Sequence, residues 1–143
     1  MQYQRLRGTG ATVSRLSLGA MTFGAQTDEP TAKRIVDTAL DAGINFVDTA
    51  DVYVGGASEE IVGRALKGKR DKVVLASKVR GLGGEDKDRV AGLHRWHIIH
   101  GVEASLKRLG VECLDICYMH RPDRNTPIEE SLAAFDTLVQ QGK

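Results

Sequence analysis

The sequence lacks an apolar run long enough to cross a bilayer, and its first residues, MQYQRLRGTG, lack the apolar core of a signal peptide. It also lacks an excess of charge, since 20 Lys and Arg residues against 19 Asp and Glu residues give a net charge of +1. This balance gives no reason to expect nucleic acid or an anionic membrane as a partner.

Cysteine is scarce as well. The two cysteines, Cys113 and Cys117, both fall in one predicted strand. Four residues of strand separate them by roughly 13 Å, which is too far for a disulfide between them. With no signal peptide and no predicted disulfide, we expect the protein to lie in the cytoplasm, where thiols stay reduced.

Linker segments rich in Pro or Ser are absent, and so are low-complexity tracts. Hydrophobic residues make up 41% of the 143 residues, which suits a folded domain with a sizeable core rather than a disordered chain. We therefore expect residues 1–143 to form a single structural unit.

The chain does contain a regular alternation of short apolar segments and amphipathic helical segments. A β-hairpin is predicted first, with Gly8 and Gly10 at its turn. Strands are then predicted at LSLGAMTFG, INFVDTA, KVVLASK and CLDICYMH, each followed by a helix. This order is typical of a parallel sheet with right-handed crossover connections.

The predicted helix starts carry capping signals. Asp28 and Pro30 predict the start of the first helix, and Ser58 is predicted to cap the second. The third helix is expected to run from about Leu93 to Leu109. Before the fourth, the segment 126–129 (Thr-Pro-Ile-Glu) has the spacing of a capping box with proline at the first helical position.

Four polar side chains lie at the ends of successive predicted strands or just past them: Asp48, Tyr53, Lys78 and His120. Sites in parallel α/β folds form beyond the C-terminal ends of the strands, so we expect these side chains to converge. A tyrosine is a poor proton donor at neutral pH unless a neighbouring ammonium stabilises the phenolate. A carboxylate can hold that ammonium, and a histidine can hydrogen-bond a carbonyl oxygen. The set is suited to protonating a carbonyl while a hydride reaches its carbon.

The motifs around these residues resemble the aldo-keto reductase family. They are VDTADVYVGGASEEIVGRAL, LASK and YMHRPD, and the segments SLKRLGVECLDICYMHRPD and TPIEESLAAFDTLVQQGK are similar to the family as well. The resemblance covers essentially the whole chain and is strongest to the bacterial branch that includes the potassium-channel β subunits. It implies an α/β fold: an N-terminal β-hairpin followed by four βα units of a TIM (β/α)8 barrel, a half or truncated barrel.

The resemblance also implies an NAD(P)H-dependent oxidoreductase that reduces aldehydes or ketones to alcohols. Tyr53 would be the general acid, and Lys78 would favour its ionised form. Asp48 would pair with Lys78, and His120 would orient the substrate carbonyl. The implied cofactor is NADPH, and the implied partner is a small carbonyl compound.

Further site residues are expected around this set. Met21, Thr22 and Phe23 match the part of the family that lies near nicotinamide or substrate. We expect Met21 and Thr22, with Asp48, to contact the cofactor and Phe23 to contact the substrate. Trp96, near the start of the third predicted helix, is expected to form a wall of the substrate pocket.

A complete barrel of this type needs about 250 residues, and its strands five to eight have no counterpart in this sequence. In the family those later strands supply most cofactor contacts, so we expect the acid–base residues here and most of the cofactor site elsewhere. A half barrel has two unpaired edge strands and an exposed inner wall, and we therefore expect the chain to self-associate if it is truly truncated.

Alternatives remain open at this point. The chain is either a natural truncation or a piece of a longer protein, and it is either part of a reductase or a non-catalytic binding or regulatory module of the same fold. The carbonyl substrate and the choice between NADPH and NADH are also open, because the deciding residues of the family lie in its later strands.

Two other patterns invite a ligand interpretation. His94, His97 and His100 would spread over roughly 120° of a helix surface, which does not favour a metal site. No metal is therefore expected. The glycine-rich segment 81–84 lacks the pattern of a phosphate-binding loop, and we interpret it as part of an active-site loop.

Overall fold

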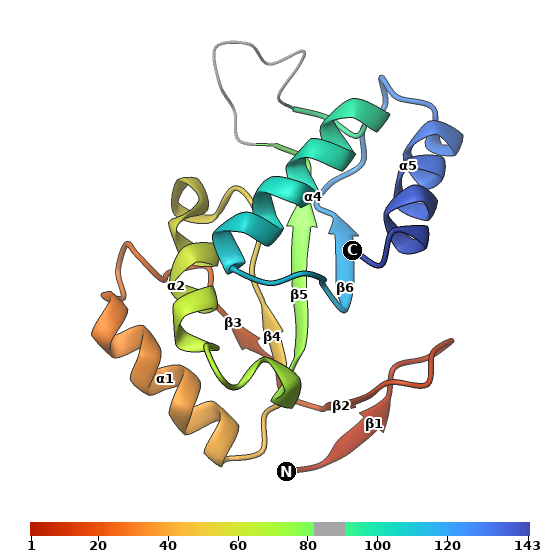
Figure 1. Ribbon diagram of the computed structural model, residues 1–143. Coiled ribbons are helices and arrows are strands. Elements are labelled where there is room, and N and C mark those ends of the chain that lie inside the picture. The colour runs from red at the N-terminus through yellow and green to blue at the C-terminus, as the bar shows by residue number, and fades with distance from the viewer. Residues whose placement is uncertain (82–90) are drawn as a thin grey trace.

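The computed structural model describes residues 1–81 and 91–143. It contains an antiparallel hairpin, β1 with β2, and a parallel sheet in the order β3-β4-β5-β6 (Figure 1). The strands are β1 (Tyr3–Arg5), β2 (Thr12–Ser14), β3 (Leu18–Gly19), β4 (Phe46–Asp48), β5 (Val74–Val79) and β6 (Ile116–Met119). Strands therefore lie side by side in chain order, as right-handed βα repeats require.

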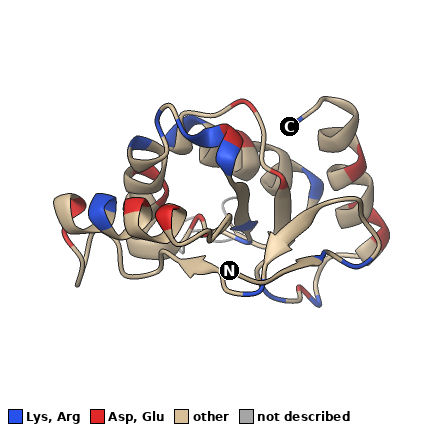
Figure 2. Ribbon diagram, turned by 90° about the horizontal axis from the view of Figure 1, so that it is seen from below, with Lys and Arg blue, Asp and Glu red and all other residues tan. Residues whose placement is uncertain are grey.

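Each strand of the parallel sheet is followed by a helix, and each helix packs against the next one along the chain. The helices are α1 (Glu29–Asp41), α2 (Ala57–Ala65), α4 (Arg95–Leu109) and α5 (Ile128–Gln140), with 3₁₀ turns η1 (Tyr53–Gly56) and η2 (Arg70–Lys72). Seen from below, basic and acidic residues are both present on the helices, in keeping with the near-neutral composition (Figure 2). Across residues 1–81 and 91–143, no helix is long and apolar enough to cross a membrane.

The core lies between the helices and one face of the sheet. One buried cluster joins α1 and α2 to β4 and β5 through residues such as Val36, Val47 and Leu66, and a second joins α4 and α5 to the sheet. Fully burying side chains of this size stabilises a fold by about 1.5–3 kcal/mol each, so these clusters hold the helices in place. Along β5, Leu75, Ser77 and Val79 are buried, and Lys78 is only partly buried. Because side chains alternate along a strand, Lys78 points to the opposite face from Ser77.

The predicted architecture is confirmed: a hairpin followed by four βα units. The strands occupy the predicted segments but are shorter, since β3 pairs only at Leu18 and Gly19. Asp28 caps α1 as predicted, because its Oδ1 accepts from the Thr31 backbone N–H at 2.9 Å and Pro30 lies in the first turn. The predicted loop 81–84 lies outside the described residues except for Gly81.

Three local predictions are wrong. The Ser58 side chain does not cap α2, because its hydroxyl donates to the Ala20 carbonyl instead. Thr126 does not cap α5, since its hydroxyl donates to Asp123 Oδ2. Both side chains find acceptors elsewhere in the fold, which capping statistics cannot anticipate.

The third wrong prediction concerns the cysteines. Cys113 lies before β6 and is exposed, so the two cysteines do not share a strand. Cys117 lies within β6, where burial raises the pKa of its thiol to about 12. It therefore stays protonated at neutral pH.

Candidate active site

Lys78 is the centre of a cluster at the sheet face that the helices do not cover. Its Nζ donates to Asp48 Oδ2 at 2.6 Å, to the Thr49 carbonyl at 2.8 Å and to Tyr53 Oη at 3.1 Å. A lysine ammonium has three N–H groups, so each of them has an oxygen acceptor here. Nζ also lies 4.7 Å from the centre of the Tyr53 ring.

Adjacent elements bring these side chains together. Asp48 is the last residue of β4 and pairs with Ala76 of β5, which lies two residues before Lys78. Asp48 is therefore close to Lys78 on the neighbouring strand. Tyr53 begins the η1 turn, five residues after Asp48. The predicted convergence of Asp48, Tyr53 and Lys78 is therefore what the structure shows, while their catalytic role stays a proposal.

The turn after Tyr53 has unusual backbone geometry. Val54 has φ 51° and ψ 41°, and Gly55 and Gly56 also have positive φ. A left-handed conformation costs a non-glycine residue roughly 1–2 kcal/mol, and strain of this kind is concentrated at functional sites. Three successive residues with positive φ thus connect Tyr53, which contacts Lys78, to the first residue of α2, Ala57.

His120 follows β6 and joins the same cluster. Its backbone N–H donates to the Val79 carbonyl at 3.1 Å, and its ring meets the Tyr53 ring edge-on, with centres 5.6 Å apart and planes at 87°. Burial lowers the pKa of His120 below its ordinary value, and the positive charge of Lys78 lowers it further. The imidazole is therefore uncharged at neutral pH and carries one N–H and one lone pair.

An open cavity of about 390 Å³ is lined by three residues of this cluster, Asp48, Lys78 and His120, and not by Tyr53. Its wall carries polar groups of Asp48, Lys78 and His120 beside the apolar surfaces of Phe46 and Met119. A few polar groups in a mostly apolar wall are typical of sites for small organic ligands.

Other predicted site residues lie elsewhere. Phe23 is 2% exposed and packs in the core, whereas Met21 is 60% exposed, and neither lines the cavity beside Lys78. The Thr22 hydroxyl is hydrogen-bonded to that of Thr27 at 3.1 Å. These residues follow Ala20, whose N–H donates to the Asp48 carbonyl at 2.9 Å, so the segment stays tied to the site by its backbone.

Trp96 lines a second, smaller cavity of about 180 Å³ rather than the one beside Lys78. Its ring stacks on that of His100, with centres 4.2 Å apart. The wall also includes Asp51 and His97, both buried, and each has one side-chain atom, Asp51 Oδ1 and His97 Nε2, without a hydrogen-bond partner among the described residues.

The three helical histidines have separate roles. The His94 ring accepts from the His97 backbone N–H at 3.3 Å and so caps α4. His97 is buried, and His100 is bonded to the Trp96 carbonyl. Within the described ranges, no three His, Cys, Asp or Glu residues form a metal-binding group.

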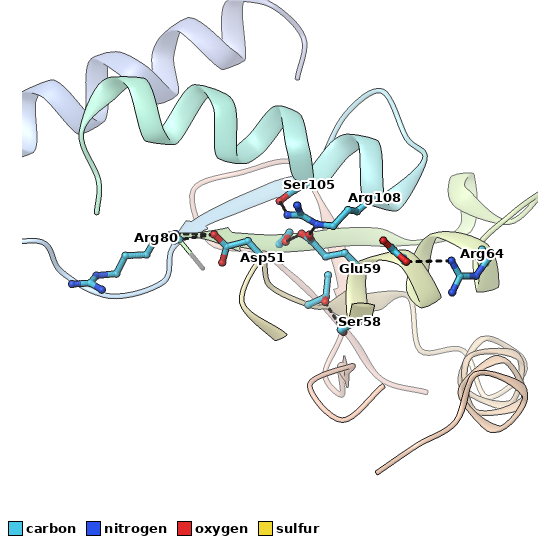
Figure 3. A network of polar contacts seen from close by, with 11 residues as sticks. Asp51, Ser58, Glu59, Arg64, Arg80, Ser105 and Arg108 are labelled. Carbon is cyan, nitrogen blue, oxygen red and sulfur yellow. Dashed lines mark hydrogen bonds and ion pairs between the residues drawn. The ribbon is translucent and has the colours of Figure 1, made fainter. Parts of the chain in front are cut away.

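Two buried acids near the site were missed by sequence reasoning. Asp51 accepts from the backbone N–H groups of Arg80 and Gly81 at 3.2 and 2.9 Å, and Glu59 pairs with Arg108 at 2.7 Å (Figure 3). In the sequence Glu59 resembles any acid in a first helical turn, and only the absence of solvent around it marks it as different.

Known proteins resemble this chain over nearly its whole length. The profile of the Aldo/keto reductase family matches residues 15–143. A probable voltage-gated potassium channel subunit beta of Arabidopsis thaliana is 44% identical over 148 residues, covering 99% of this chain and 44% of that protein. The uncharacterized oxidoreductase YrpG of Bacillus subtilis (strain 168) is 45% identical over 153 residues, covering 100% of this chain and 47% of that protein.

A solved structure is similar over the same extent. It is the aldo-keto reductase AKR11C1 from Bacillus halodurans in its holo form, with a TM-score of 0.89 and 38% identity, covering 99% of this chain and 47% of that one. The chain thus spans less than half the length of the relatives it matches.

Proposed function

The chain belongs to the aldo/keto reductase family, and from this premise we propose that the cluster around Lys78 is the proton-delivery part of an NADPH-dependent reductase of aldehydes or ketones. The activity is proposed for a protein of the relatives' length that contains this chain. The observation that carries the proposal is the 3.1 Å contact between Lys78 Nζ and Tyr53 Oη, with Asp48 Oδ2 at 2.6 Å from the same nitrogen.

In the proposed reaction, Tyr53, Lys78, Asp48 and His120 together carry out one proton transfer. Tyr53 Oη gives its proton to the carbonyl oxygen of the substrate, and the Lys78 ammonium stabilises the phenolate that remains. Asp48 keeps that ammonium in place, so the positive charge is aimed before the reaction begins. The uncharged His120 ring offers an N–H to the carbonyl oxygen and fixes its direction.

The cavity beside the cluster fits the nicotinamide end of such a cofactor. Its 390 Å³ and its mixture of apolar and polar wall suit a flat ring next to a small carbonyl compound. Asp48 would contact the cofactor from the wall, and Met21 and Thr22 from the segment bonded to Asp48. When bound, the cofactor supplies the hydride that reaches the carbonyl carbon, and with the proton from Tyr53 this completes an alcohol.

Replacing Tyr53 by Phe in a protein of the relatives' length tests the proposal. Removing the hydroxyl should lower kcat/KM for an aldehyde by about 10²–10⁴-fold, the usual contribution of a general acid, while the Kd of the cofactor stays the same. Steady-state kinetics and cofactor titration measure the two quantities. The matched control is Tyr3→Phe, which removes a distant hydroxyl bonded to the Gly43 carbonyl. Unchanged turnover in Tyr53→Phe contradicts the assignment of Tyr53 as the acid.

A binding or regulatory module is the second candidate function. The similarity to proteins named as potassium channel β subunits from Arabidopsis thaliana and Oryza sativa favours it. NADPH oxidation with a reactive aldehyde by a protein of the relatives' length separates the two candidates, and quenching of Trp96, the one tryptophan of these 143 residues, reports cofactor binding. Cofactor binding without turnover favours the regulatory module, and turnover favours the reductase.

A further inference from the structure

We propose that Ser58 and Glu59, in the first turn of α2, are positioning residues that aim Lys78 and its acceptor from behind the sheet, with Arg108 as the counter-ion of Glu59. The inference rests on the proposed function, because it assigns these residues to the placing of the group that assists Tyr53. Neither residue lines the cavity beside Lys78.

Glu59 is held on both of its oxygens. Its side chain is 0% exposed, its Oε1 accepts from Ser77 Oγ at 2.5 Å, and its Oε2 accepts from Arg108 Nε at 2.7 Å (Figure 3). Arg108 in turn donates from Nη2 to Ser105 Oγ at 3.1 Å. A buried carboxylate with charged and neutral donors on separate oxygens has little freedom to move, so it is a fixed point behind β5.

Ser77 connects the fixed Glu59 carboxylate to Lys78. Ser77 and Lys78 are neighbours in β5 and point to opposite faces, so anchoring the Ser77 side chain on the helix side restricts rotation of the strand about its axis. The same stretch of β5 is pinned by its backbone, because the Lys78 carbonyl accepts from the Asp51 N–H at 3.1 Å. The direction in which Lys78 leaves the sheet is thereby set from the far side.

Ser58 fixes one of the acceptors of Lys78. Its Oγ donates to the Ala20 carbonyl at 2.7 Å, and since a hydroxyl has one hydrogen, it accepts from Thr49 Oγ1 at 2.9 Å. Ser58 and Thr49 are both fully buried. The Thr49 carbonyl then accepts from Lys78 Nζ at 2.8 Å. Two consecutive residues of α2 therefore hold the donor and one acceptor of the same hydrogen bond.

Stability is a weak reason for an ion pair here, where Glu59 is fully buried and the Arg108 side chain is 20% exposed. Replacing such a pair by apolar side chains of similar volume is often neutral or stabilising. The same helix carries Arg64, which forms an exposed pair with Glu29 of α1 at 2.6 Å. It is a matched control for the loss of an ion pair from α2.

The decisive variant is the double substitution Glu59→Met with Arg108→Leu, in a protein of the relatives' length. It removes the anchor of Ser77 without leaving an unpaired buried charge. We expect cooperative unfolding to be kept, kcat to fall roughly 10- to 100-fold because a small misplacement of a catalytic group is costly, and the Kd of the cofactor to stay the same. Because all three of its N–H groups are hydrogen-bonded, the Lys78 ammonium of the parent protein should give a slowly exchanging ¹⁵N signal, assigned by its loss in Lys78→Met. In the double variant this signal should disappear.

Arg64→Gln should keep both the signal and kcat. Ser77→Ala removes only one hydroxyl and should weaken the same signal and lower kcat. It tests the positioning role of Glu59 if the double variant does not fold. An unaltered ammonium signal and unaltered kcat in the folded double variant or in Ser77→Ala overturn the proposal. If Tyr53→Phe leaves turnover unchanged while the ammonium signal still depends on Glu59, the proposed function fails and the positioning role stands.

Discussion

His97 is a buried histidine outside the cluster around Lys78. It lies in α4 with its side chain buried, and its Nε2 has no hydrogen-bond partner among the described residues. Burial lowers the pKa of His97 below its ordinary value, although the charge of Asp51 acts in the opposite direction. The folded protein thus favours the uncharged ring more strongly than the unfolded chain does.

This preference makes stability depend on pH. The unfolded chain binds a proton at His97 near the ordinary value of about 6.5, while the folded protein binds it only at lower pH. Stability from the uncharged ring is therefore complete above about pH 6.5 and is lost as the pH falls through the lowered native value. Urea denaturation at pH 7.5 and 5.5 should show a smaller loss of unfolding free energy in His97→Phe than in the parent.

His100→Gln is the control for this measurement, because it removes an exposed histidine of the same helix whose ring is hydrogen-bonded to the Trp96 carbonyl. Part of the pH dependence should persist in His97→Phe, since His120 also has a lowered pKa. Equal pH dependence in His97→Phe and in the parent would contradict the role given to burial of this ring.

For individual residues, the sequence alone predicted a position in the site where that position follows from the order of strands and helices. Asp48, Lys78 and His120 stand at or just past the ends of apolar segments, and parallel pairing brings such ends together. Glu59 was not predictable, because whether a first-turn acid meets solvent or a buried arginine depends on how α4 packs on α2. The tertiary contact decides the role, and no local pattern encodes it.

Among the elements, α2 and α4 make an especially close contact. Gly63 lies against the last turn of α4, and a Cβ built on it would stand 2.2 Å from the Leu109 carbonyl oxygen. Gly63 does not have a left-handed backbone, so a glycine is required at this position only because there is no space for a side chain. The close approach lets Arg108 reach Glu59.

Gly63→Ala should therefore destabilise the fold, although alanine is the better helix former by about 1 kcal/mol. Overpacking against backbone typically costs about 1–3 kcal/mol, which exceeds that gain. Urea denaturation measures the change in unfolding free energy. Gly10→Ala, where a Cβ meets nothing within 4 Å, should leave it nearly unchanged. A more stable Gly63→Ala protein would show that the two helices separate at little cost.

The elements themselves were largely predictable, and their ends were not. Apolar segments of strand length between glycines gave all four parallel strands, and the 3.6-residue periodicity gave the helices. The caps at Ser58 and Thr126 were misjudged because a hydroxyl bonds whichever acceptor the folded chain brings near, here the Ala20 carbonyl and Asp123. His94 capped α4 although histidine is not a favoured capping residue.

For the molecule as a whole, the distribution of apolar surface is uneven. The outer side of α5 exposes Ile128, Leu132 and Val139, the last of them 75% exposed. The sheet ends at β3 on one side and β6 on the other, and within the described residues neither strand has a second neighbour in the sheet. Exposed edges and contiguous apolar residues are features of surfaces that associate.

The 143-residue chain by itself should therefore self-associate. Size-exclusion chromatography with light scattering at low micromolar concentration should give a mass above the 15.5 kDa of one chain. The double variant Leu132→Lys with Val139→Lys should shift the equilibrium toward the monomer, whereas the control Lys107→Gln, on α4, should not. A well-folded monomer of the parent chain at that concentration would contradict the prediction.

The three hydrogen bonds of Lys78 also affect how this lysine would react with an aldehyde. An amine with a free lone pair condenses with an aldehyde and loses water to give an imine, which would inactivate a reductase exposed to its own substrate. The Lys78 nitrogen instead donates to Asp48, Thr49 and Tyr53, so its hydrogens are all engaged and no lone pair faces the cavity. The arrangement that places the charge beside Tyr53 also makes this lysine a poor nucleophile toward the compounds the site is proposed to receive.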